Sequence, residues 1–230
     1  MDAAKTTGKK RKVDVKKLVI LAMLTGIAYV VMLVSKLMPS VNGFLDFDFK
    51  DVVICIGGFI YGPVSAAAMS LVVSFIEMVT VSHTGIWGFL MNFLATASFC
   101  CTACYIYKKH HTMKGAVLGL ATGVVALVVV MLLWNYLVTP IYQGVKRKVI
   151  VEMLLPVFLP FNAVKGGMNL AATLLLYKPV VTALRKAKLI PASESATPPV
   201  LGKKRIGSYL VSLFVLVTFV LLALALANVI

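Results

Sequence analysis

The fold is decided by the stretch LPFNAVKGGMNLAATLLLYK, residues 159–178, which is apolar enough to lie in a membrane. Near its start it carries Asn162, Lys165 and Asn169, spaced by three and then four residues. That spacing places the three polar side chains on one face of a helix. An ammonium group inside a bilayer costs about 3 kcal/mol unless it meets water or partners. Lys165 is therefore a candidate functional residue, although a lysine near a helix end can also extend to the membrane surface.

The composition around this stretch is that of an integral membrane protein. The chain has 230 residues, of which 60% are hydrophobic and 13% are charged. Its net charge of +15 is compatible with a nucleic-acid partner, but the basic residues lie in short stretches between apolar runs. Such a distribution is the topology signal of membrane proteins. We expect a lipid membrane as the surroundings, no nucleic-acid partner, and no separate soluble catalytic domain.

The apolar runs predict an all-α polytopic fold with six core spans and a separate seventh span. The expected domains are a basic cytoplasmic tail at residues 1–17, a six-span membrane domain at 18–188, a linker at 189–207 and an additional transmembrane helix at 208–230. The core spans are expected at about residues 18–38, 51–61, 64–81, 89–107, 116–138 and 159–178.

The second apolar run is interrupted by Gly62 and Pro63, and two interpretations compete there. In the first, the run is one bent span. In the second, a short span is followed by a tight turn and then by a full span. A glycine-proline pair favours the turn. The charges agree with the turn. With the N-terminus in the cytoplasm, seven basic residues precede the first span, three flank His110 and seven lie between Lys178 and Arg205, against five on the outside.

The loop before the second span ends in FLDFDFK, residues 44–50, in which apolar and charged residues alternate. A period of two suits an extended segment with one apolar face. Such a segment can be a lid over a pocket or an ordinary loop resting on helix ends. Two polar residues lie near the outer ends of other spans. We interpret Glu77 as an interfacial carboxylate rather than a pocket residue, and Asn135 as either a second pocket amide or a helix-end residue.

The cysteines and histidines do not form a convincing metal or catalytic site. Cys55, Cys100, Cys101 and Cys104 all lie in apolar runs, where small buried thiols are the usual interpretation. No nucleophile, zinc or phosphate-binding motif is present in the sequence. We therefore expect no enzyme activity, no catalytic residue, no metal and no cofactor. A membrane enzyme that uses the cysteine cluster is the contrary hypothesis, which alanine replacement of those cysteines would test.

What remains is a pocket open to the outside, built from amides, one lysine and an aromatic loop. Amides and a lysine can hydrogen-bond a polar heterocycle, while apolar and aromatic side chains cover its faces. This suits capture of a small, flat solute that is uncharged or anionic. Residues 142–152, which include Lys146, Arg147 and Lys148, are expected as an outer loop.

These features resemble the riboflavin-binding S component of energy-coupling-factor (ECF) vitamin transporters. The resemblance rests on LDFDFKDVVICIGGFIYGP, on WNY at the end of the fifth span and on PFNAVKG opening the sixth, and runs from about Lys17 to Arg185. It implies a bacterial cell-membrane subunit, multi-pass and with a cytoplasmic N-terminus, that binds riboflavin as its transported ligand. It also implies a partner module of one transmembrane coupling protein and two cytoplasmic ATPases.

The resemblance also implies roles for particular residues. Asn135, Asn162 and Lys165 match the positions that contact the flavin. Leu45, Asp46 and Phe47 match the loop that packs over the ligand. Ala22 and Gly26, a pair of small residues four apart in the first span, match the surface that meets the coupling protein.

Three alternatives stay open at this point. In the first, the ligand is flavin mononucleotide or another vitamin; the basic residues 146–148 would favour a ligand that carries a phosphate. In the second, the chain is a flavin-supply component for extracytoplasmic electron transfer. The third concerns the seventh span, which departs from the six-helix pattern: it either anchors a partner or is an extension of this lineage.

Overall fold

The protein was analysed as a computed structural model, which describes residues 14–41, 45–82, 84–190 and 203–227. The described chain is helical, and one isolated bridge pairs Val41 with Leu45. Most of the predicted basic tail and linker lie outside the described residues. The helices are α1 (Val15–Ser35), α2 (Lys50–Tyr61), α3 (Pro63–Thr80), α4 (Gly85–Lys109), α5 (Met113–Leu137), α6 (Thr139–Gln143), α7 (Arg147–Met153), the π-helix η1 (Leu154–Phe158), α8 (Leu159–Lys186) and α9 (Lys203–Leu226).

The chain turns back sharply between α2 and α3, as the glycine-proline pair predicted. Gly62 has φ 93° and ψ 169°, a conformation that residues with a side chain rarely adopt, and Pro63 starts the next helix. A Cβ built on Gly57 would lie 2.7 Å from the sulfur of Met69, so the two helices run back along each other. The single bent span is therefore excluded.

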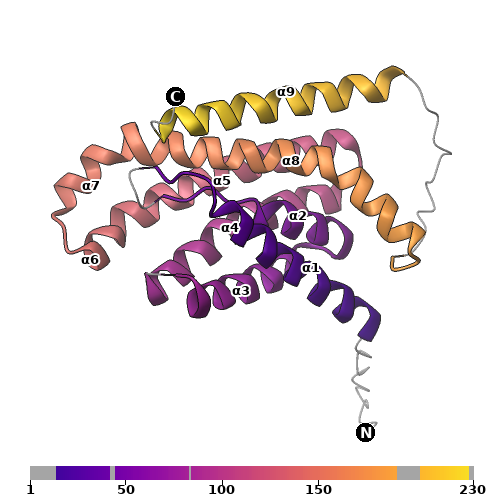
Figure 1. Ribbon diagram of the computed structural model, residues 1–230, viewed down its shortest axis with the longest axis horizontal. Coiled ribbons are helices and arrows are strands. Elements are labelled where there is room, and N and C mark those ends of the chain that lie inside the picture. Colours follow the sequence, from indigo (N-terminus) through magenta and orange to yellow (C-terminus); the bar gives the residue numbers. More distant parts are fainter. Residues whose placement is uncertain (1–13, 42–44, 83, 191–202, 228–230) are drawn as a thin grey trace, which may run out of the picture.

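The short helix α2 forms the centre of the core. Nine of its twelve residues are buried, and it contacts α1, α3, α4 and α8 (Figure 1). Twelve residues make a helix of about 18 Å, which is shorter than the hydrocarbon core of about 30 Å. Lys50 and Asp51 at its start are fully buried, although the sequence placed Lys50 among the outer loop charges.

The approach to α8 is helical, which corrects the expectation of an outer loop at residues 142–152. Helices α6 and α7 occupy most of that stretch, and α7 continues through η1 into α8 without a break from Arg147 to Lys186. Pro156 lies within η1, where the missing proline N–H and the bulk of its ring disturb regular α-helical bonding. A π-helical turn absorbs this disturbance, so the helix continues.

Six described helical segments are long and apolar enough to cross a membrane, namely α1, α3, α4, α5, the continuous α7–η1–α8 segment and α9. Together with the short α2 they give the predicted six-helix core plus one additional C-terminal helix. In Figure 1, α9 lies alongside α8, and its C-terminal end is near the start of α8. The extra helix therefore packs against the stretch that carries Asn162 and Lys165.

The cysteines pack between α2 and α4. The Cys55 thiol lies 3.1 Å from the Cys100 sulfur, and Cys104 donates to the carbonyl oxygen of Cys55. All four are free thiols, and Cys55, Cys100 and Cys104 are buried. Small, weakly polar side chains of this kind let two helices approach closely.

Candidate functional site

A cavity of about 270 Å³ lies where the ends of α1, α3, α5 and α6 meet the start of α8. It lies at the end of α5 and α8 that is opposite to their basic ends, which carry Lys114, Arg185 and Lys186. Its apolar lining includes Met32, Met91, Met131 and Phe161, and its polar lining includes Lys36, Glu77, Asn92, Asn135, Tyr142, Asn162 and Lys165. The cavity therefore combines apolar walls with a few hydrogen-bonding groups, as small-molecule sites usually do.

One wall of the cavity is the loop between α1 and α2. Leu45, Asp46, Phe47 and Asp48 all line the cavity, and the Phe47 ring packs 4.9 Å from the ring of Phe161 in α8. The loop is tethered near its end, where the backbone N–H of Phe49 donates to the Ser35 hydroxyl. Leu45 and Phe47 are buried while Asp46 is half exposed, so the alternation predicted from the sequence holds for these three residues.

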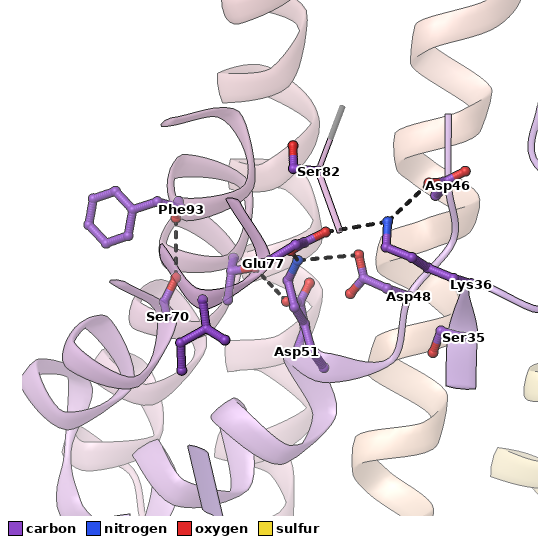
Figure 2. A network of polar contacts seen from close by, with 12 residues as sticks. Ser35, Lys36, Asp46, Asp48, Asp51, Ser70, Glu77, Ser82 and Phe93 are labelled. Atoms are coloured by element: carbon purple, nitrogen blue, oxygen red, sulfur yellow. Dashed lines mark hydrogen bonds and ion pairs between the residues drawn. The ribbon is translucent and has the colours of Figure 1, made fainter. Parts of the chain in front are cut away.

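The alternation ends at Asp48, whose side chain turns inward and meets Lys165. The Asp48 carboxylate accepts a hydrogen bond of 2.7 Å from the Lys165 ammonium. The same carboxylate lies 3.7 Å from the Lys50 ammonium, which donates a hydrogen bond of 2.8 Å to the Glu77 carboxylate. A carboxylate oxygen of Glu77 lies 3.5 Å from the Lys36 ammonium, which lies 3.3 Å from the Asp46 carboxylate. Figure 2 shows this outer part of the network.

We call these six residues the charge chain, because lysines and carboxylates alternate along it: Asp46, Lys36, Glu77, Lys50, Asp48 and Lys165. Three positive and three negative groups balance. Burying an ion is costly unless a partner of opposite charge and hydrogen bonds compensate. The pairing explains how Lys50, with 0% exposure, and Lys165, with 7%, remain in the protein interior.

The charge chain changes two interpretations from the sequence. Glu77 is 5% exposed and lines the cavity, so its interpretation as an interfacial carboxylate is wrong. Asp48 and Lys50 were not identified as site residues. Their pairing with groups on α3 and α8 joins positions far apart along the chain, which helical or strand periodicity cannot detect. The signal available was a buried-looking lysine at 165 that required a counter-charge.

The two asparagines are held by their own helices. The Asn135 side chain donates to the Met131 carbonyl at 2.7 Å and accepts from the Thr139 hydroxyl, and Asn162 donates to the Phe158 carbonyl. An amide carries two N–H donors and one oxygen acceptor. Each side chain is thus fixed in direction by one donor and keeps a second donor for another group.

Asn169 has a structural place beside the cavity. Its amide donates to the backbone oxygen of Asp48 at 3.0 Å and to that of Lys165, which ties the loop to α8. All three polar residues of the opening stretch are buried and face the same elements, as their spacing predicted. One oxygen of Asp48 has no hydrogen-bond partner among the described residues, so this cavity-lining carboxylate can still accept a hydrogen bond.

The pKa of Asp48, a loop residue, is lowered to about 2. Burial opposes ionisation, but the nearby Lys165 and Lys50 ammonium groups outweigh it. A carboxyl with a lowered pKa stabilises the folded state above its ordinary value of 3.8, and this contribution is lost as the pH falls towards 2.

We therefore expect the stability difference between the unchanged protein and Asp48→Asn to shrink as the pH falls from about 4 towards 2. Thermal unfolding of both proteins in detergent across this range measures it. A difference that stays constant below about pH 4 would contradict the ion pair with Lys165.

Comparison with known proteins gives a result that agrees with this fold and cavity. The family model described as the ECF transporter substrate-specific component matches residues 16–177. The chain belongs to this family of S components. The match begins at the start of α1 and ends inside α8, so it includes the loop, the cavity residues and the charge chain, and it excludes α9.

Relatives of this S component are named riboflavin transporters. The chain is 31% identical over 161 residues to riboflavin transporter FmnP of Bacillus subtilis, covering 66% of this chain and 85% of that protein. It is 29% identical over 177 residues to riboflavin transporter RibU of Staphylococcus aureus, covering 74% and 93%. A solved structure of the S component of a bacterial ECF transporter has a TM-score of 0.65 and 29% identity, covering 75% of this chain and 99% of that one.

These findings confirm the resemblance noted in the sequence, together with the six-helix membrane fold. The S component is a multi-pass membrane transport protein and not an enzyme, because its relatives are transporters. The structure brings Leu45, Asp46, Phe47, Asn135, Asn162 and Lys165 around one cavity. Ala22 and Gly26 lie apart from it, exposed on α1. The roles of these residues in binding stay predictions.

Proposed function

We propose that this S component captures riboflavin from outside a bacterial cell and delivers it for ATP-driven uptake. The observation that carries the proposal is the cavity onto which the α1–α2 loop, Asn135, Asn162 and Lys165 converge, in a chain related to riboflavin transporters. Met32 and Phe161 supply apolar faces for a flat ring system. The amides and Lys165 supply the donors that its oxygen and nitrogen atoms need.

The proposed orientation places the N-terminus in the cytoplasm. The cavity then opens to the outside, because it lies at the helix ends away from the basic residues 108–114 and 178–188. The proposed partners are one transmembrane coupling protein and two cytoplasmic ATPases.

An absorbance spectrum of the detergent-purified protein tests the ligand. We expect visible flavin absorption that coelutes with the protein and returns when riboflavin is added after its removal. Asn162→Ala is expected to weaken binding by about 1–3 kcal/mol, since a ligand group loses its partner in a buried site. A protein that neither carries nor binds flavin would overturn the proposal.

Flavin mononucleotide is the second candidate, and the charge chain argues against preference for it. Both lysines that line the cavity, Lys36 and Lys165, are already paired with carboxylates. A phosphate would have to displace one of those carboxylates. We therefore propose that riboflavin binds more tightly than its phosphate, which competition between the two in one titration would decide.

The proposed contact with the coupling protein lies on α1. Ala22 and Gly26 are both exposed, and no atom lies within 4 Å of a Cβ built on Gly26. Small residues on an outward face allow another membrane helix to approach closely. We expect Gly26→Trp to reduce riboflavin uptake into cells at least tenfold while affinity of the purified protein stays unchanged.

Gly26→Ala is the matched control and should retain uptake, because its methyl group meets no neighbour within the chain. Cells that lack the coupling ATPases should lose uptake as well. Uptake that persists without the ATPases would favour the flavin-supply hypothesis.

A further inference from the structure

The helix α9 lies outside the family match, yet it packs directly behind the binding residues of α8. Gly167 is two residues after Lys165, so it lies about 200° around the helix, nearly opposite to the lysine. A Cβ built at Gly167 would overlap the ring of Phe219 in α9. The phenyl ring therefore rests on the bare backbone of α8, immediately behind Lys165.

One residue of α9 also belongs to an apolar cluster that includes residues of the α1–α2 loop. Ala223 is 1% exposed and belongs to one apolar cluster with Leu45, Phe47 and Phe161, three residues that line the cavity. Leu216, Phe219 and Val220 pack against the same cluster. These residues recur at helical spacing and form one face of α9, whereas Leu210, Phe214 and Val217 on other faces are exposed.

This contact has the character of a specific helix pair. Lipid solvates apolar side chains as well as a protein interior does, so helices associate in a bilayer through close packing and small residues. The Gly167 backbone and the buried Ala223 supply two small positions, one on the side of α8 opposite to Lys165 and one in the apolar cluster that includes Leu45 and Phe47.

We propose that α9 is a brace for the binding site, and that Phe219 and Gly167 are positioning residues for ligand retention. The proposal rests on riboflavin being the ligand. Phe219 holds the segment of α8 that carries Lys165, and the Ala223 end of α9 supports the apolar cluster that includes Leu45 and Phe47. On this proposal, the ligand leaves when the α1–α2 loop with Leu45 and Phe47 moves away from the cavity. A helix that supports their apolar cluster therefore slows dissociation.

The test compares two phenylalanines on the same helix. Phe219→Ala in the full chain is expected to raise the riboflavin dissociation rate about three- to tenfold, with a smaller change in the association rate. Phe214→Ala is the matched control, since this ring is 73% exposed, and its dissociation rate should be unchanged. Stopped-flow measurement of flavin fluorescence gives both rates, and Phe219→Leu is a milder variant should the alanine variant express poorly.

A second comparison isolates the contact itself. Gly167→Ala should also raise the dissociation rate, because its methyl group displaces the Phe219 ring. The double variant Gly167→Ala, Phe219→Ala should be no faster than either single variant, since the same contact is lost in all three. If the unchanged protein binds riboflavin while the Phe219 and Phe214 variants release it at equal rates, the brace is wrong and the proposed function is untouched. If the unchanged protein binds no riboflavin, the proposed function itself fails, and the brace as a device for ligand retention falls with it.

Discussion

Replacing Lys165 with methionine is expected to lower riboflavin affinity by about 1–3 kcal/mol, or roughly 5- to 150-fold. Methionine keeps the unbranched shape of the side chain, is one atom shorter, and removes the charge. The ligand loses a charged donor in a buried site, and Asp48 loses its 2.7 Å partner. Titration of the purified variant with riboflavin, followed by quenching of flavin fluorescence, measures the effect.

A double variant separates contact with the ligand from disturbance of the charge chain. Asp48→Asn together with Lys165→Met removes one charge of each sign, so thermal stability should recover towards that of the unchanged protein. Affinity should stay low if Lys165 itself touches the flavin. Recovery of affinity along with stability would mean that Lys165 acts only as the counter-ion of Asp48.

The second large effect is expected at Lys50, where methionine should destabilise the protein by about 3–5 kcal/mol. This lysine is fully buried between Asp48 and Glu77, so its removal leaves two carboxylates with one positive charge fewer. For a chain of this size the loss corresponds to a fall in apparent melting temperature of about 6–20 °C. Thermal unfolding followed by size-exclusion chromatography in detergent measures it.

Lys36→Met is the matched control, because Lys36 contacts Glu77 in the same chain but its side chain is 30% exposed. Its removal should cost about 0–1 kcal/mol. Adding Glu77→Gln to Lys50→Met should restore part of the lost stability by removing the surplus negative charge. Equal destabilisation by the two lysine variants would disprove the idea that burial makes the difference.

The helices and the binding face of α8 could be read from the sequence because both follow from local patterns. Long apolar runs bound the spans, and the spacing of Asn162, Lys165 and Asn169 defines one helical face whatever surrounds it. The break at Gly62 was equally local, since it depends on the conformational freedom of one residue and the ring of the next.

The charge chain could not be read in this way. Asp48 and Lys165 are 117 positions apart, and no local pattern joins them. In the sequence, Asp48 and Lys50 look like ordinary loop charges, and Glu77 looks like a residue at a membrane surface. Only the packing of α2 between α1, α3 and α8 makes them neighbours. The helices α6 and α7 were expected as a loop because the charges of Lys146, Arg147 and Lys148 interrupt the apolar runs.

The shortness of α2 has a consequence for which solutes the fold can hold. A helix of about 18 Å is about 12 Å shorter than a hydrocarbon core of about 30 Å. The helix starts at Lys50, two residues after Asp48, which lines the cavity. Lengthening α2 by one turn at this end would carry the chain about 5 Å further towards the cavity, so we expect the length of this buried helix to limit the size of the solute that the cavity admits.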